Sequence, residues 1–419
     1  MESDFKPAKR SAKSFKTAAP QAKTDTEVFR TPDEIAAGQS LDAPSARTLP
    51  EVDIVPKPDR PKSGWKERLA LHWPPGKKEY ITAVVVVLLA GAGMFALAQQ
   101  DAKPQPVAKQ AQKSQVKVVK PKTVPSTLSG LPVDPSLNAR PVTGVMIENS
   151  PGSRPQSGLG DAGVVFEAIA EGGITRFLAL YQDTAPGSVG PIRSARPYYA
   201  QWVLGFDAGY AHVGGSPQAL ADIRAWGVRD LDQFANGGSY QRIASRAAPH
   251  NVYTSIAALH QLEASKGWNS SNFTGFARKP KETPSKKPDV KGINLTISGP
   301  SYGVHYTYNS PTNSYNRTVG GAPHVDANTN TQISPKVIVA MVMPYSLAAD
   351  GYHSNYATIG SGPVYIFQDG TLTTGQWTKA ANASQFTFAD AAGKPIKLNP
   401  GQTWLTVVGN PGNVAYAAQ

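Results

Sequence analysis

The residues best suited to chemistry lie between positions 154 and 216, where guanidinium groups are frequent. Four arginines fall in this stretch: Arg154, Arg176, Arg193 and Arg196. Arg193 and Arg196 are three residues apart, so in a turn both guanidinium groups could converge on one anion. The planar guanidinium fork suits phosphate and carboxylate groups, which it can bind through two hydrogen bonds. The pattern therefore predicts an anion-binding pocket.

Two carboxylates in the same stretch could take part in acid–base chemistry. Glu167 and Glu171 are four residues apart, so they would share one face of a helix that Gly172-Gly173 would end. A pair of carboxylates can hydrolyse a glycosidic bond. Two alternatives stay open. The pair could form a solvated helix face, or together with Asp161 it could neutralise the arginines in structural ion pairs.

A glycine-rich turn provides two further candidates. His212 precedes Gly214-Gly215-Ser216 and a predicted helix, and a helix N-terminus can bind an anion. Ser216 fits an N-cap better than a nucleophile. His250 and His324 stand alone in polar turns and are expected to be structural.

Other familiar sites are absent from the sequence. It contains no P-loop, HExxH, GxSxG or GxGxxG motif. Because it has no cysteine, disulfides, thiolate nucleophiles, cysteine-bound zinc and lipid-modified cysteine are all excluded. We expect no cofactor, although a carboxylate-bound Mg²⁺ remains open.

Strands and helices must position these side chains. Val142–Ile147 and Phe177–Gln182 have the apolar runs of buried strands. Gln218–Trp226 has helical spacing, with Ser216 as N-cap and Pro217 at the first helical position, and Thr254–Ser265 predicts a second helix. This alternation indicates a mixed α/β domain over residues 130–277.

A second region follows a basic, proline-rich break. Residues 278–293 predict a linker or an exposed loop. Residues 294–410 are rich in Thr, Tyr, Val and turn residues, which predicts a small, mostly β domain. The predicted fold class is thus an α/β N-terminal ectodomain plus a β-rich C-terminal domain.

The N-terminal part predicts a membrane anchor. Tyr80–Ala98 carries no charge, so residues 79–99 are long and apolar enough for one transmembrane helix. Lysine and arginine are denser before this run than after it, which places the N-terminus in the cytoplasm and the large domain outside the membrane. Cleavage after Ala98 is the alternative to an uncleaved anchor.

Polar segments flank the predicted anchor. Residues 1–78 predict a disordered cytoplasmic tail, and residues 100–129 a stalk rich in proline and lysine. Most of the excess positive charge (net +12 for the chain) falls in these segments, so we expect no nucleic-acid partner. The stalk lysines could instead contact anionic lipids or wall polymers.

Several motifs resemble a known family. VGPIRSARPYY, AHVGGSPQAL and HNVYTS resemble the N-terminal domain of the YerB-like family, and VIVAMVMPY and GSGPVYIFQDGT its C-terminal domain. The resemblance covers about residues 130–410 and implies a bacterial cell-envelope protein of a group without a settled activity. Many members look like lipoproteins. Here a spanning helix would replace the lipid, because the chain lacks cysteine.

A second, distant likeness concerns the order of PIRSAR and HVGGSPQAL. It is similar to the LytR-CpsA-Psr phosphotransferases, which attach wall glycopolymers to peptidoglycan and bind a polyprenyl-pyrophosphate lipid. The likeness implies that Arg193 and Arg196 match that family's arginine pair. Ser194 stands where that family has aspartate, a departure that bears on both metal binding and catalysis.

The leading functional hypothesis is a membrane-anchored envelope protein. It would bind a polyprenyl-phosphate-linked glycan or a wall polymer through an arginine-lined pocket, and phosphotransfer is left open. The candidate ligand-binding residues are Arg154, Glu167, Glu171, Arg176, Arg193, Arg196, His212 and Ser216. The alternative is a non-catalytic envelope scaffold, and a hydrolase using the two glutamates is third.

Overall fold

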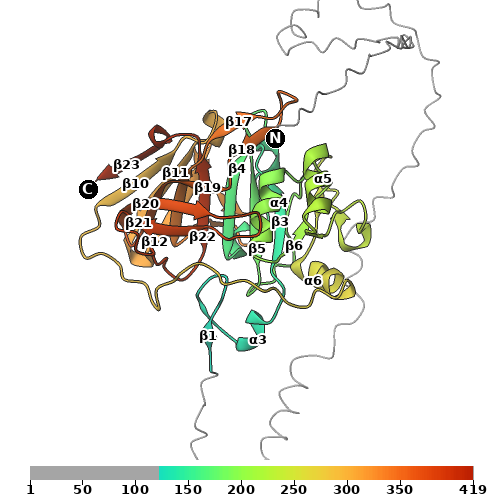
Figure 1. The fold of residues 1–419 in the computed structure, drawn as a ribbon, viewed down its shortest axis with the longest axis horizontal. Helices are drawn as coiled ribbons and strands as arrows, with labels where there is room; N and C mark the ends of the chain where they lie inside the picture. Colours follow the sequence, from blue (N-terminus) through green and yellow to red (C-terminus); the bar gives the residue numbers. More distant parts are fainter. Residues whose placement is uncertain (1–121, 419) are drawn as a thin grey trace, which may run out of the picture. The chain divides into compact units, whose positions relative to one another are not determined.

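The computed structural model describes residues 122–418 (Figure 1). The predicted tail (1–78), the predicted membrane helix (79–99) and most of the predicted stalk (100–129) lie outside the described residues. Within residues 122–418, no helix is both long and apolar enough to cross a membrane.

A ten-stranded mixed sheet forms the centre of the fold. Its strands, in spatial order, are β21 (Thr387–Asp390), β20 (Thr371–Lys379), β19 (Gly360–Gln368), β16 (Val337–Val342), β22 (Thr403–Val408), β4 (Val164–Glu171), β5 (Ile174–Tyr181), β3 (Thr143–Glu148), β6 (Gly209–Ala211) and β7 (Arg229–Asp230). Every residue of β3, β16 and β22 is buried. Such continuous apolar strands are typical of a sheet covered on both faces.

The two predicted domains share this sheet. β22 pairs in parallel with β4, so that Trp404 lies beside Val165 in the ladder. The large sheet therefore contains strands from both predicted domains, 130–277 and 294–410. The two sets of strands are joined by the hydrogen bonds between β4 and β22.

The predicted linker at 278–293 is an ordered segment of this body. The partly buried Arg278 donates hydrogen bonds to the carbonyls of Asn399 (2.8 Å) and Leu128 (2.7 Å). Lys279 Nζ lies 2.6 Å from a carboxylate oxygen of Asp369. The last residues of the segment already belong to β10, which begins at Val290.

A second sheet and a helix cover one face of the large sheet (Figure 1). The strands of this sheet, in order, are β13 (Ala322–Pro323), β12 (Ser314–Val319), β11 (Val304–Asn309), β10 (Val290–Leu295) and β23 (Val414–Ala418). Helix α6 (Ile256–Ser265) packs on the same face through Ile256 and Leu259. The core between the sheets includes Tyr306, Phe177 and Trp404.

Two helices and a loop cover the opposite face. They are α4 (Pro197–Leu204), α5 (Pro217–Ala225) and the segment around Phe386. Trp202 of α4 stacks on Phe166 of β4 with ring centroids 5.2 Å apart. This aromatic layer fixes α4 against the centre of the sheet, because large rings bury much apolar area in a defined geometry.

The remaining elements are short. They are α3 (Pro135–Asn138) and the strand pairs β1–β2 (Val124–Pro125, Pro132–Val133), β8–β9 (Gln241–Arg242, Val252–Tyr253), β14–β15 (Val325–Asp326, Thr331–Gln332) and β17–β18 (Tyr345–Leu347, Ser354–Tyr356).

Most elements predicted from the sequence are confirmed. β3 and β5 occupy the two predicted strands, and α5 and α6 the two predicted helices. Ser216 caps α5, since its Oγ accepts a hydrogen bond from the Ala219 amide at 3.3 Å. The part beyond residue 293 is mostly β. The described fold is thus a mixed, sheet-rich body with a β-rich C-terminal part.

The helix predicted across Glu167 and Glu171 is wrong. Both residues lie in β4, where Val, Phe and Ile favour a pleated, buried surface. Gly172 and Gly173, with φ of 52° and 76°, form the turn of the β4–β5 hairpin rather than ending a helix. A register shift between Ile169 and Glu171 marks a bulge in β4. Such a bulge re-aims the side chains that follow it.

Candidate functional site

One buried carboxylate joins two of the predicted arginines. Glu171, at the end of β4, forms ion pairs with Arg176 of β5 and with Arg196, the N-cap residue of α4. Arg176 also donates to the Ser194 carbonyl at 3.0 Å, and Arg196 to the Ala195 carbonyl at 2.6 Å. The guanidinium groups therefore link β4, β5 and the start of α4.

This group of Glu171, Arg176 and Arg196, the arginine cluster, carries one more positive than negative charge. The Arg176 and Arg196 side chains are 3% and 5% exposed. Burial, and then the neighbouring Arg196, lower the pKa of Arg176. The Nε atoms of both arginines are buried and have no hydrogen-bond partner in residues 122–418. Such excess buried charge is costly unless another group compensates it.

Arg193 has a carboxylate of its own. Its Nε lies 3.0 Å from Glu148 Oε2, at an angle that makes an ion pair rather than an aligned hydrogen bond. The Glu148 carboxylate also lies 2.7 Å from His250 Nδ1 and accepts a hydrogen bond from Ser150 Oγ at 2.8 Å. Arg193 and Arg196 thus engage different carboxylates, and Arg193 is the more accessible, with 25% of its side chain exposed.

Glu167 belongs to a different buried network. Arg317 of β12 donates to both of its carboxylate oxygens, at 3.0 and 2.9 Å. Trp404 Nε1 donates to the same carboxylate at 3.1 Å, and the Arg317 guanidinium lies 4.4 Å from the Trp404 ring centroid. Arg317 also donates to the hydroxyl of Tyr306 and to a ring nitrogen of His324, at 2.6 and 2.9 Å.

The two predicted glutamates therefore do not act as a pair. Glu167 reaches Arg317 in the five-stranded sheet, whereas Glu171, beyond the bulge, reaches Arg196 beside α4. They lie on opposite faces of the large sheet, so they cannot flank one glycosidic bond. Arg317 was not predicted as a functional residue, because one arginine in a polar strand gives no signal of full burial.

The other predicted residues are separate from the arginine cluster. Arg154 donates to the side chain and carbonyl of Asn149 and to the Ser301 carbonyl, at 2.9–3.0 Å. His212 is fully buried and lies 3.1 Å from Asp230 Oδ1 and 2.8 Å from the Gly214 carbonyl. Both side chains bond to loop residues, and within residues 122–418 neither forms a hydrogen bond or an ion pair with the arginine cluster.

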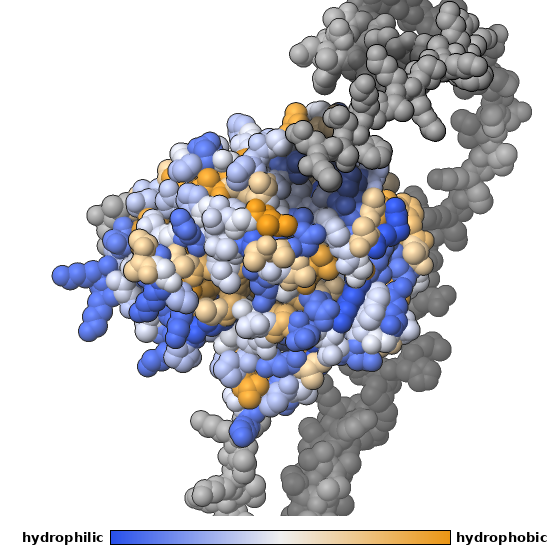
Figure 2. Space-filling view, viewed as in Figure 1, coloured by the Kyte–Doolittle hydropathy of each residue, from blue (hydrophilic) through white to orange (hydrophobic). Residues whose placement is uncertain are grey.

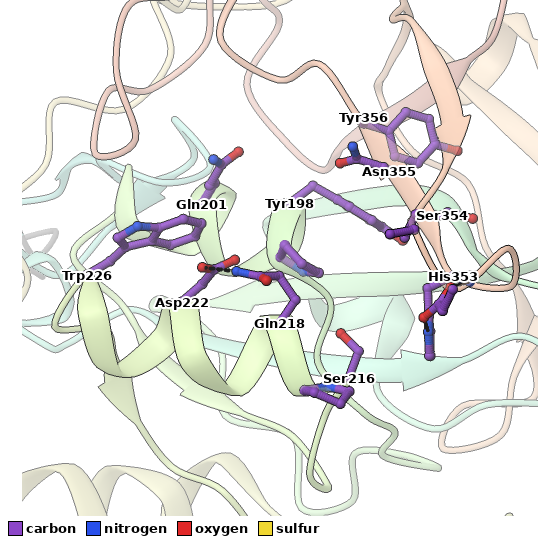
Figure 3. Close-up of a pocket in the computed structure, with 15 residues that line it drawn as sticks. Tyr198, Gln201, Ser216, Gln218, Asp222, Trp226, His353, Ser354, Asn355 and Tyr356 are labelled. Atoms are coloured by element: carbon purple, nitrogen blue, oxygen red, sulfur yellow. Dashed lines mark hydrogen bonds and ion pairs between the residues drawn. The ribbon is translucent and has the colours of Figure 1, made fainter. Parts of the chain in front are cut away.

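A cavity of about 660 Å³ opens between α4, α5 and the β17–β18 hairpin (Figure 3). Three aromatic residues line it: Tyr198, Trp226 and Tyr356. Its polar lining residues are Gln201, Ser216, Gln218, Asp222, Asp350, His353, Ser354 and Asn355. Of the predicted candidates, only Ser216 is in this lining, and the lining contains no lysine or arginine.

The arginine cluster lies directly behind one wall of this cavity. Glu171 forms a β-bridge with His353, and Ala195 forms one with Gly215, the residue before Ser216. Pro197, which follows Arg196, lines the cavity. The cluster therefore ties β4 and β5 to the start of α4, and β-bridges at Glu171 and Ala195 connect the same region to the hairpin and to the start of α5.

Paired side chains give the cavity a fixed polar surface. Gln218 Nε2 donates to Asp222 Oδ1 at 2.7 Å on neighbouring turns of α5, as Figure 3 shows. Gln201 donates to Asn382 Oδ1 at 3.2 Å and accepts a short hydrogen bond from Thr358. Hydrogen bonds from His353 and two backbone amides hold the pKa of Asp350 well below its usual value.

The hairpin that forms one wall exposes large apolar side chains on its outside. Tyr345, Leu347 and Tyr352 of the hairpin, and Ile359 just after it, are 40–55% exposed. Figure 2 shows hydrophobic residues at the upper edge of the molecule, where Figure 1 places β17. No cluster of three or more His, Asp or Glu side chains suited to a metal ion occurs in the described part of the chain.

Comparison with known proteins decides the family. Residues 128–269 match the model "Protein of unknown function (DUF3048) N-terminal domain", and residues 293–405 match the model of its C-terminal domain. The chain is also 30% identical over 295 residues to "Putative lipoprotein YerB" of Bacillus subtilis (strain 168), covering 68% of this chain and 87% of that protein. The chain belongs to the DUF3048, or YerB-like, family.

A solved structure agrees with this assignment. The crystal structure of the YerB protein from Bacillus subtilis matches with a TM-score of 0.63 and 26% sequence identity, covering 70% of this chain and 99% of that one. The YerB-like resemblance seen in the sequence is thus confirmed. The likeness to LytR-CpsA-Psr phosphotransferases stays an untested prediction.

Proposed function

We propose that this YerB-like protein is a cell-envelope protein that binds a glycan, or the glycan part of a wall polymer, in the cavity between α4, α5 and the β17–β18 hairpin. One observation carries the proposal. The lining combines the rings of Tyr198, Trp226 and Tyr356 with amide, hydroxyl and carboxylate groups, and it lacks lysine and arginine. This composition suits a ligand that has apolar C–H faces and many hydroxyl groups.

The physical argument rests on hydrogen-bond complementarity. A sugar hydroxyl both donates and accepts, and the amides of Gln201, Gln218 and Asn355 offer both functions in return. Asp222 and Asp350 accept further hydrogen bonds. Because several of these side chains are already held by neighbours, less conformational entropy is lost when a ligand binds.

The envelope location rests on two supports. The Bacillus subtilis relative is named a putative lipoprotein, and residues 79–99 have the length and apolarity of a membrane span. An outward-facing domain on such an anchor would meet wall polymers directly.

The proposal can be tested with one matched pair of tryptophans. Trp226 ends α5 and lines the cavity, whereas Trp268 follows α6 and lies outside it, and both are partly buried. We expect Trp226→Ala in the full-length protein to weaken binding to purified wall glycans about tenfold, because a stacking surface is lost. Trp268→Ala should bind like the wild type. Equal affinities for all three proteins would refute the cavity as the glycan site.

A second candidate function is the binding of an anionic group on the same ligand. The surplus positive charge of the arginine cluster favours this function. Two arginines share Glu171, and their Nε atoms have no partner in the described structure. The test is Arg196→Ala, measured by thermal melting and by binding of an anionic wall polymer. Weaker binding with an unchanged melting temperature supports the anion site. A lower melting temperature with unchanged binding supports a purely structural role. No contact described here favours phosphotransfer over binding.

A further inference from the structure

A second cavity, of about 570 Å³, lies elsewhere on the same face of the large sheet. It is enclosed by residues 274–277 on one side and by β21 with the turn after it on the other. Its walls include Phe276, Phe386, Phe388 and Ile396, and all four belong to the core on this face.

The chemistry of this lining differs from that of the first cavity. No Lys, Arg, His, Asp or Glu contributes to it, and the only side chains able to form hydrogen bonds are those of Thr274 and Thr387. Water in such a space finds few polar partners, so replacing it by an apolar group is favourable. The lining therefore selects an apolar ligand.

The position of the cavity in the chain indicates that a lipid is the available apolar ligand. Gly275 in its wall packs so closely on the Thr127 carbonyl that a Cβ there would lie 2.1 Å from the oxygen. The cavity thus lies beside the point where the chain enters the folded body. The 27 residues from 100 to 126 separate Thr127 from the predicted membrane span at 79–99, and a proline-rich stretch of that length can span up to ~80 Å. Lipid is therefore within reach.

We propose that this cavity binds one aliphatic hydrocarbon chain, from a membrane lipid or a free fatty acid. The proposal does not rest on glycan binding in the first cavity. The two sites are nevertheless close in the fold, since Gln201 in the first cavity bonds to Asn382, four residues before Phe386 in the second.

The experiment uses the full-length protein reconstituted in phosphatidylcholine vesicles. One sample contains a phospholipid with a diazirine on its acyl chain, and the other contains the same diazirine on a free fatty acid. After illumination, mass spectrometry locates the label. We expect label in the peptides that contain residues 273–277 and 386–396. Label in the phospholipid sample identifies a membrane lipid as the source of the bound hydrocarbon chain, and label in the fatty-acid sample identifies a free fatty acid.

Variants make this test specific. Thr274 and Thr387 line the cavity and are exposed, so a charged residue at either position should leave the core undisturbed. Thr387→Glu and Thr274→Glu should each reduce labelling of these peptides roughly tenfold, because each brings a charge next to the apolar ligand. Thr374→Glu on neighbouring β20, also exposed and outside the cavity, is the matched control. Absence of label from these peptides, or equal labelling in all variants that melt like the wild type, would overturn the proposal.

Discussion

At the scale of single residues, the arginines have two different environments. Arg176 and Arg196 share one carboxylate, whereas Arg317 and Glu167 form a balanced pair that Trp404 also contacts. Removing one partner of a balanced buried pair leaves an unpaired charge in a medium of low polarity. Removing one arginine from a cluster with surplus positive charge leaves Glu171 with a partner. The two sites should therefore respond differently to substitution.

We expect Arg317→Ala to lower the free energy of unfolding by about 3–5 kcal/mol, because Glu167 would stay buried without a cation. Tyr306 and His324 would lose the same hydrogen-bond partner. Chemical denaturation followed by tryptophan fluorescence measures the change. The double variant Glu167→Gln/Arg317→Met should recover much of the loss. If Arg317→Ala unfolds at the wild-type denaturant concentration, the network does not support the fold.

A second prediction concerns Glu263 of α6, which is fully buried and accepts a hydrogen bond from Thr143 at 2.9 Å. Burial raises the pKa of Glu263 to about 8 from an ordinary value of 4.5. At pH values between 4.5 and about 8, Glu263 is protonated in the folded protein but ionised in the unfolded chain. The free energy of unfolding should thus fall by up to about 1.4 kcal/mol per pH unit from pH 4.5 to about pH 8.

Glu263→Gln should remove this dependence, since glutamine does not titrate. Denaturation midpoints measured at pH 5, 6, 7 and 8 test it. The variant's curve should be flatter than that of the wild type over this range. Parallel curves would mean that Glu263 is ionised in the folded protein.

At the scale of elements, local signals located two helices and two strands of the N-terminal part but not α4. Ser216-Pro217 fixed the start of α5, and apolar runs marked β3 and β5. The bulge in β4 had no such signal, yet it decides that Glu167 and Glu171 face opposite sides. The cavity was also hidden, because its walls come from residues 197–226 and 348–356, which only the folded sheet brings together. The predicted anion pocket likewise depended on partner carboxylates that spacing does not reveal.

The segment between α6 and β10 allows an element-scale prediction. Arg278 and Lys279 are bonded to the body, whereas Lys281, Lys286 and Lys287 are exposed. Limited trypsin should therefore cut first after Lys281 and Lys286 within the described residues. Because β22 pairs with β4, the two fragments should stay together in gel filtration. Fragments that elute separately would show that the shared sheet is not stable after cleavage.

At the scale of the whole molecule, the prediction concerns orientation at the membrane. The stronger positive charge before residue 79 predicts that the N-terminus lies inside and the folded body outside. Protease added to intact protoplasts should therefore remove the body and spare an N-terminal tag. Loss of the tag with survival of the body would reverse the orientation.

The pairing of β4 with β22 also affects how the protein is made. These neighbours are more than two hundred residues apart in the chain, so the centre of the sheet is assembled from distant segments. Such high contact order slows folding, because a long loop must close before the pairing stabilises it. During synthesis, the exposed edge of β4 stays unpaired until the last strands have left the ribosome. Until β22 has been synthesised, the nascent chain therefore exposes a strand edge of the kind that favours aggregation.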